Sequence, residues 1–152
     1  MSADADTPRF VVCEDGTEYL ERFTRFLGDD FTFIAARHCE AARVAAAAGA
    51  DGLLLDLDFR RTPREQLVDE RGPAPAGLDD DRRRRLAETQ GILILRQLRA
   101  GGITLPAVLF ADIDDEDQQD YLRQTLAPLT IASSRLGIRD IGGLLRSLLP
   151  RR

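Results

Sequence analysis

The chain has 152 residues, of which 43% are hydrophobic and 31% charged, and it carries a formal net charge of −5. This composition is typical of one globular domain, so we expect a single domain over 1–152 with its core at about 9–149. The negative charge disfavours nucleic-acid binding, and no apolar run reaches about 18 residues, the length of a membrane span. Two cysteines are too few for a disulfide framework, which favours a cytoplasmic location.

The first third of the chain alternates between short apolar runs and helical patterns. Between residues 17 and 27 the apolar side chains fall on one helical face, and Gly28 follows as a stop signal. Residues 53–55 are all leucine, which is typical of a strand that is buried on both faces. The patterns predict, in order, a strand over 9–13, a helix over 17–27, a strand over 31–36, a helix over 39–48 and a strand that begins at residue 52.

The segment 59–81 interrupts this alternation with three prolines, two glycines and many charged residues. We therefore expect an irregular insertion over about 59–85. Because the segment has few apolar residues to bury, we expect it to be mobile or to pack outside the sheet. Opposite charges four residues apart in 79–85 predict the start of an exposed helix, which would run to about residue 99 with an interruption at Gly91.

The last third of the chain returns to the alternating pattern. Acidic residues at 112–117 suit the N-terminus of a helix, where the helix dipole favours negative charge. The patterns predict a strand over 105–111, a helix over 114–126, a strand over 129–132 and a helix over 138–149. Five strand–helix units with short connections predict an α/β fold, a (βα)5 doubly wound, five-stranded parallel sheet with one insertion between the third strand and the third helix.

Carboxylates follow two of the predicted strands. Asp56 and Asp58 end the apolar run that begins at residue 52, and Glu14 and Asp15 follow the first strand. A carboxylate inside a sheet is unfavourable unless it is paired, so we expect Asp56 at the carboxyl edge, where the ligand sites of α/β proteins open.

The order and spacing of these elements resemble those of a response-regulator receiver domain of bacterial two-component signalling, over residues 9–149. The resemblance implies a flavodoxin-like topology and a Mg²⁺ site. Glu14 and Asp15 match the acidic pair that holds the metal. Asp56 matches the phosphoacceptor aspartate, and Asp58 matches the residue whose backbone carbonyl contacts the metal. An aspartate nucleophile needs such charge neutralisation to attack a phosphoryl group, and without it the pKa of at least one acid should rise.

Three positions depart from the family. Ala111 stands where a Thr or Ser hydroxyl would contact the phosphate, Ser134 and Arg135 stand where a lysine and a proline are expected, and Ile131 replaces an aromatic residue. The chain has no lysine at all. Arg135, or the hydroxyl of Ser133 or Ser134, could reach the phosphate instead, although simple loss of the switch is the favoured interpretation. We expect a receiver-like signalling domain with phosphorylation-weak or phosphorylation-independent regulation.

The resemblance implies a sensor histidine kinase or another signalling protein as partner, and a homodimer through the fifth strand and the last two helices. Self-phosphorylation of Asp56 from small donors would be its only enzymatic step. A haloacid-dehalogenase-like phosphatase is an alternative, because Asp56 and Asp58 match its Asp-x-Asp signature. Against it, Arg60 stands where Thr or Val is expected, and that family also needs a lysine. A domain of the same fold without a site is the third hypothesis.

Overall fold

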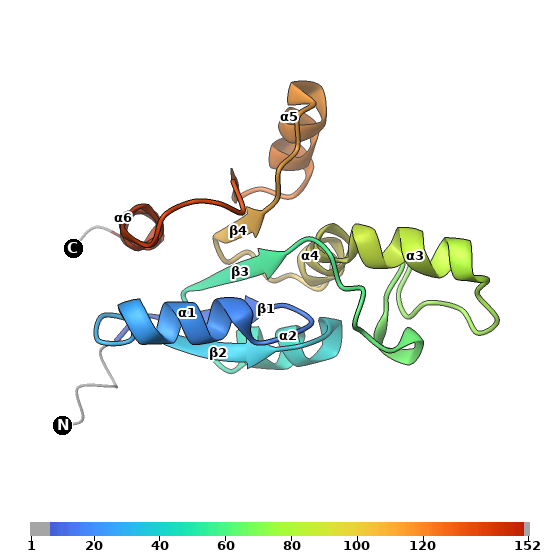
Figure 1. Ribbon diagram of the computed structural model, residues 1–152, viewed down its shortest axis with the longest axis horizontal. Helices are drawn as coiled ribbons and strands as arrows, with labels where there is room; N and C mark the ends of the chain where they lie inside the picture. The colour runs from blue at the N-terminus through green and yellow to red at the C-terminus, as the bar shows by residue number, and fades with distance from the viewer. Residues whose placement is uncertain (1–6, 151–152) are drawn as a thin grey trace.

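The computed structural model describes residues 7–150, and five short strands in this part form one parallel sheet (Figure 1). The strand order is β2-β1-β3-β4-β5, which is the flavodoxin-like order of doubly wound sheets. The predicted fold is therefore confirmed. The strands are β1 (Arg9–Cys13), β2 (Thr32–Ala36), β3 (Gly52–Asp56), β4 (Ala107–Phe110) and β5 (Leu129–Ala132).

Helices connect the strands, and their bounds agree with the sequence patterns to within a few residues except in the region of the insertion. None of the helices in residues 7–150 has the length and the apolar character of a membrane span. The helices are α1 (Glu18–Leu27), α2 (Cys39–Ala47), α3 (Asp80–Glu88), α4 (Gln90–Ala100), α5 (Glu116–Thr125), α6 (Ile138–Leu148) and a 3-10 turn, η2 (Arg64–Gln66).

Helices cover both faces of the sheet, which explains why the central strands are apolar without alternation. Leu53 and Leu55 pack into a cluster with residues of α2, α4 and α5. Leu54, between them, packs on the opposite face with residues of α1 and α6. Successive side chains of a strand point to opposite faces, so one uninterrupted leucine run supplies both halves of the core.

The predicted helix over 79–99 is two helices, which corrects the sequence interpretation. α3 ends at Glu88, and Thr89, with φ −120° and ψ 17°, separates it from α4. The break is at Thr89 and not at Gly91, which lies inside α4 and is buried. A Cβ at Gly91 would overlap the carbonyl oxygen of Asp56 and would stand 3.0 Å from its carbonyl carbon. Glycine is needed here because the backbone of α4 packs directly on the end of β3.

The insertion is irregular, as predicted, but the expectation that it has few apolar side chains to bury is wrong. Phe59, Leu67, Val68 and Leu78 are all buried. The fully buried side chain of Gln90 accepts a hydrogen bond from the Val68 amide at 2.8 Å and donates one to its carbonyl at 3.0 Å. Figure 1 shows the insertion and α3 beyond the arrowheads of β1, β2 and β3. The segment is thus a docked extension of the sheet's carboxyl edge.

Arg99 joins three stretches of backbone near the edge of the sheet where β4 and β5 begin. Arg99, in the last turn of α4, donates hydrogen bonds to the carbonyls of Ile103 and Leu105 at 2.9 and 2.8 Å. It also donates to the carbonyls of Leu126 and Pro128 at 3.1 and 2.9 Å. Partial burial lowers the pKa of this guanidinium. Arg99 therefore links the end of α4 to the segments that enter β4 and β5.

Candidate functional site

The candidate site is the edge of the sheet at which β1 and β3 end. β1 ends at Cys13 and is followed by Glu14 and Asp15, while β3 ends at Asp56. Cys13 is paired in register with Leu55, so the acids after the two strands lie side by side. In a sheet of this order the chain leaves β1 and β3 in opposite directions, and ligand sites form at that switch point.

Asp56 is half-buried at the centre of this edge. Its Oδ1 accepts a hydrogen bond from the Leu57 amide at 2.9 Å. Burial, together with the negative charges of Asp15, Glu14 and Asp58, raises the pKa of Asp56 to about 6 against the effect of that hydrogen bond. The acids are therefore close enough to repel one another, as the clustering of carboxylates predicted.

Glu14 is directed into the start of α1. Its side chain is buried, and its two oxygens accept hydrogen bonds from the amides of Tyr19 and Leu20 at 3.1 and 2.9 Å. Burial raises the pKa of Glu14, although these two hydrogen bonds act in the opposite direction. Glu14 thus satisfies free amides in the first turn of the helix, a structural task that occupies both of its oxygens.

Tyr19 forms one side of the site. Its ring stacks on Phe110 with 5.1 Å between centroids, and Phe110 is the strand partner of Asp56. Burial, followed by the charge of Asp56, raises the pKa of Tyr19 to about 12. From the sequence, Tyr19 is one of the residues on the apolar face of a helix, and its position beside the acids follows from the packing of α1 over β4.

Asp15 is paired with an arginine of the insertion. Its Oδ1 accepts from the Arg61 guanidinium at 2.9 Å, and its Oδ2 accepts from the Arg61 amide at 2.9 Å. The same guanidinium donates to Glu18 at 2.7 and 3.1 Å. These bonds lower the pKa of Glu18 to about 2. Sequence reasoning missed Arg61, and its only local signal is that it follows the acids of β3 by a few residues.

Asp58 is paired with the residue next to Arg61. Its two carboxylate oxygens accept hydrogen bonds from the amide and the Nε of Arg60, at 3.0 and 2.7 Å. A carboxylate held at both oxygens by an arginine is arranged as an acceptor rather than as a proton donor. This pairing disfavours the general-acid role that a haloacid-dehalogenase-like phosphatase would require of Asp58.

The residues at the positions expected to contact a phosphate, Ala111, Ser134 and Arg135, do not present one free hydroxyl and one cation to the site. Ala111 directly follows Phe110, the strand partner of Asp56, and its methyl group is buried in the core. The hydroxyls of Ser133 and Ser134 both donate to Asp112, Ser133 at 2.9 Å. These bonds lower the pKa of Asp112, and the charge of exposed Arg135 acts in the same direction. The serines therefore join the ends of β4 and β5 to each other through Asp112.

The acids as arranged do not fit the Mg²⁺ that the resemblance implied. Magnesium requires octahedral coordination by oxygen atoms that face a common point. Both oxygens of Asp15 are held by Arg61, and both oxygens of Glu14 are held by the start of α1. Over residues 7–150, no three acidic, histidine or cysteine side chains are grouped in a way that could hold a metal ion.

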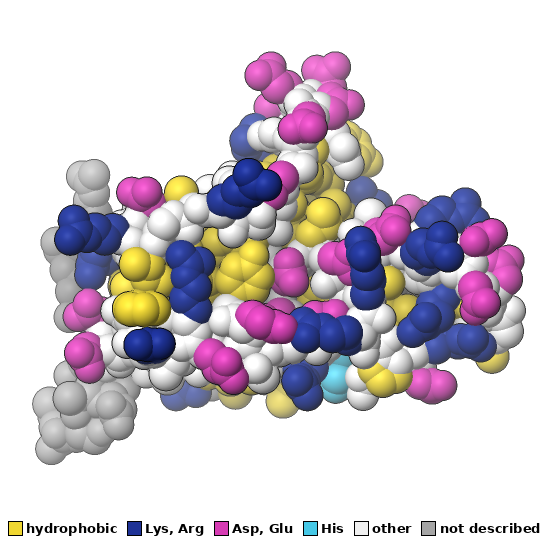
Figure 2. Space-filling view, viewed as in Figure 1, with side chains coloured by type: hydrophobic (Ala, Val, Ile, Leu, Met, Phe, Trp, Pro, Cys, Tyr) yellow, Lys and Arg dark blue, Asp and Glu magenta, His cyan; other side chains and the backbone are white. Residues whose placement is uncertain are grey.

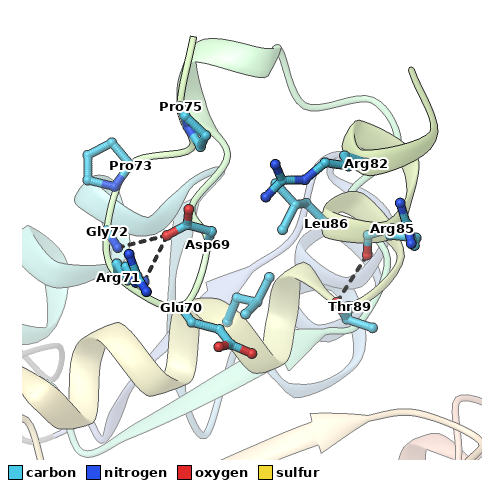
Figure 3. A pocket seen from close by; sticks show the side chains of 11 residues that line it. Asp69, Glu70, Arg71, Gly72, Pro73, Pro75, Arg82, Arg85, Leu86 and Thr89 are labelled. Carbon is cyan, nitrogen blue, oxygen red and sulfur yellow. Dashed lines mark hydrogen bonds between the residues drawn. The ribbon is translucent and has the colours of Figure 1, made fainter. Parts of the chain in front are cut away.

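A separate cavity of about 810 Å³ lies between the turn of the insertion and α3 (Figure 3). Asp69 accepts hydrogen bonds from the amides of Arg71 and Gly72 on one side, and Arg82 and Arg85 project from α3 on the other. None of the four acids of the candidate site lines this cavity. The cavity is therefore a feature of the insertion and not part of the site at the sheet edge.

Comparison with solved structures identifies the fold. No protein-family model and no curated protein sequence matches the chain. The BeF3-activated N-terminal receiver domain of Klebsiella pneumoniae RstA superposes with a TM-score of 0.63 at 19% identity, covering 95% of this chain and 100% of that one. The Francisella response regulator 1452 receiver domain gives a TM-score of 0.63 at 14% identity, over 93% of this chain and 96% of that one.

A two-component response regulator from Clostridium difficile is similar to the same extent, with a TM-score of 0.63 at 11% identity over 93% of this chain and 95% of that one. At sequence identities this low, the comparison supports a shared fold but does not establish which residues form a site. With its strand order, its two helical layers and the acids after β1 and β3, the chain has the fold of a response-regulator receiver domain.

Proposed function

We propose that this protein is a receiver-like signalling domain of a bacterial two-component or related pathway, and that its regulation depends weakly or not at all on phosphorylation. The observation that carries the proposal is the environment of Ala111. A methyl group stands where a hydroxyl would contact the phosphate, and the nearby serine hydroxyls already donate to Asp112. A phosphoryl group at the end of β3 would find no free hydroxyl on β4 or β5 among these groups.

Asp56 is the proposed phosphoacceptor. Its Oδ1 accepts the Leu57 amide, and its Oδ2 accepts no hydrogen bond from the described residues. Because the pKa of Asp56 is about 6, the carboxyl is mostly ionised at neutral pH and can act as a nucleophile. Attack of Oδ2 on a small phosphodonor would form an acyl phosphate while the donor's leaving group departs with the electrons of the broken P–O bond.

We expect this transfer to be slow, because a phosphoryl group brings negative charge to a site already surrounded by carboxylates. Metal-assisted transfer through Glu14, Asp15 and the Asp58 carbonyl, which the resemblance implied, requires carboxylate oxygens of Glu14 and Asp15 that already accept hydrogen bonds in the present arrangement. Mass spectrometry after incubation with Mg²⁺ and acetyl phosphate tests this. We expect a minor fraction of wild-type protein to gain the mass of one phosphoryl group, and none of Asp56→Asn.

The proposed output surface consists of α5, β5 and α6. It would bind a sensor histidine kinase, another signalling protein or a second copy of the chain. Figure 2 shows acidic side chains gathered over α5, and Glu116 and Asp117 lie in its first turn. Tyr121 on the same helix is 56% exposed and adds an aromatic ring to this acidic surface. We propose that partners bind this surface equally well whether or not Asp56 carries a phosphoryl group.

Nuclear magnetic resonance of the isotope-labelled protein tests the proposal without an identified partner. Addition of Mg²⁺ and beryllofluoride, a phosphoryl mimic, should leave the amide signals of β5 and α6 unmoved. Any shifts should be confined to neighbours of Asp56, and Asp56→Asn is the matched control. Shifts that spread over β5 and α6 in the wild type alone would contradict the proposal, because Arg135 or a serine would then carry the switch. Hydrolysis of an aryl phosphate that requires Asp56 and Asp58 would support the phosphatase alternative instead.

A further inference from the structure

The pairing of Arg61 with Asp15 connects the insertion to the candidate site. Arg61 uses its backbone amide and its guanidinium on the two oxygens of a single carboxylate, each at 2.9 Å. The Asp15 side chain is only 6% exposed, whereas that of Arg61 is 58% exposed. The arginine thus lies over a buried carboxylate, and the acid has no oxygen left without a donor.

The backbone on both sides of Arg61 is fixed. Phe59 is fully buried, and its amide donates to the Ala87 carbonyl at 2.8 Å. Thr62 is also buried, and its amide donates to the Phe59 carbonyl at 3.1 Å. The guanidinium therefore extends from a short turn that has a buried residue on each side and is bonded to α3 through the Phe59 amide. A preorganised cation of this kind loses less entropy on pairing than one on a free surface loop.

Gly16 provides the space that the guanidinium occupies. A Cβ at this position would stand 2.8 Å from the guanidinium carbon of Arg61 and would overlap Glu18. The residue after the acidic pair is thus small where the arginine approaches. Glu18 supplies a second carboxylate to the same guanidinium at 2.7 Å. The Arg61 guanidinium is thus bound by the carboxylates of Asp15 and Glu18 in the space that Gly16 leaves open.

We infer that Arg61 is the resident counter-cation of the acidic site, and that it holds Asp15 in place of a divalent metal. This inference rests on the proposed receiver-like function, since it concerns the same acids. A guanidinium is always charged and matches a carboxylate with directed hydrogen bonds. A metal ion would have to displace those bonds before it could reach Asp15. The insertion, which follows β3 directly, is what brings the cation to the site.

Arg60 offers a matched control for Arg61. The two are adjacent, both are exposed, and each pairs with one acid that follows a central strand, but Arg60 pairs with Asp58 and not with Asp15. Mn²⁺ serves as the probe, because it resembles Mg²⁺ in its ligands and its free ion is counted directly by electron paramagnetic resonance. The variants are Arg61→Ala, Arg61→Gln and Arg60→Ala in the full chain.

We expect Arg61→Ala and Arg61→Gln to bind Mn²⁺ about tenfold or more tightly than the wild type, because removal of the guanidinium frees Oδ1 of Asp15 and takes away its positive charge, while the backbone amide of residue 61 still donates to Oδ2. Arg60→Ala should bind as weakly as the wild type. Asp15→Asn added to Arg61→Ala should abolish the gain. Circular dichroism establishes that each variant is folded, and Arg61→Gln, which keeps polar contacts, covers the case in which the alanine variant unfolds.

Equal Mn²⁺ affinity in the wild type and both Arg61 variants would overturn the inference, whether that affinity is high or undetectable. A gain in Arg60→Ala as large as in Arg61→Ala would also overturn it, since general charge removal would then explain the effect. None of these measurements contains a phosphoryl mimic. Failure of the inference is therefore distinguishable from failure of the proposed function, which shows only as shifts over β5 and α6 on addition of beryllofluoride.

Discussion

Substitution of Gly91 by alanine should destabilise the protein, although alanine is the better helix former. In α4 the backbone at Gly91 faces the end of β3, and an added Cβ would overlap the Asp56 carbonyl oxygen. It would also stand 3.0 Å from the Asp56 carbonyl carbon and 3.1 Å from the Cα of Leu57. All three atoms belong to backbone, so no side-chain rotation can relieve the contact and the helix must move away from the strand.

Two opposing effects set the change in the free energy of unfolding: the higher helix propensity of alanine and the overlap of its Cβ with the backbone of β3. Alanine gains roughly 0.5–1 kcal/mol over glycine inside a helix. Overpacking costs about 1–3 kcal/mol, and a contact with backbone in a fully buried position belongs at the upper end of that range. We therefore expect a net loss of about 2 kcal/mol in the free energy of unfolding. For a chain of this size that corresponds to a melting temperature lower by about 4–8 °C.

Gly143→Ala is the matched control. Gly143 lies inside α6, and a Cβ there would meet no heavy atom within 4 Å. Gly143→Ala should therefore show only the effect of helix propensity, and its free energy of unfolding should rise by roughly 0.5–1 kcal/mol. Urea unfolding followed by far-ultraviolet circular dichroism measures both variants, because the chain has no tryptophan. Gly91→Ala as stable as Gly143→Ala would refute the close approach of α4 to β3.

Other predictions concern charge and the insertion. The folded-state pKa of Asp56 is raised, so its ionisation weakens folding as pH rises from about 4 to 6, and Asp56→Asn should be more stable than the wild type at pH 7 and equal to it below pH 4. The full shift corresponds to about 3 kcal/mol, which solvent screening at this half-exposed carboxyl reduces to about 1 kcal/mol. A stability difference that does not change with pH would contradict this. Gln90→Leu leaves the Val68 amide and carbonyl without partners, which costs about 1–3 kcal/mol and should expose 59–79 to limited proteolysis. Cleavage no faster than in wild type would show that the apolar anchors suffice.

The strands and most helices could be predicted because their signals are local. Residues 53–55 indicate a buried strand without knowledge of any partner, and Gly28 follows a helix end that the structure also shows. The position of acids after β1 and β3 follows from topology, once a parallel sheet is inferred. These features depend on chain periodicity and strand order alone.

The parts that could not be predicted depend on contacts between distant segments. The end of α3 is set by Thr89 and by the packing of Gly91 on Asp56, which no pattern within the helix reveals. The buried anchors of the insertion look like isolated apolar residues in a polar stretch. Arg61 reaches Asp15 across 46 residues of sequence, and its one local signal, a position shortly after the acids of β3, is shared with Arg60.

The hydrogen bonds of Arg99 should make position 99 less tolerant of substitution than the positions of its four acceptors. All four of its acceptors are main-chain carbonyls, and a carbonyl is retained whichever side chain the residue carries. The sequence at 103, 105, 126 and 128 can therefore drift, within the limits of packing, without removing a single acceptor. The donor has no such freedom, because only arginine combines this reach with a forked set of N–H groups. In a library of all single substitutions, position 99 should tolerate no replacement, whereas the four acceptor positions should tolerate every replacement that keeps their packing, with the narrowest choice at the buried Leu126.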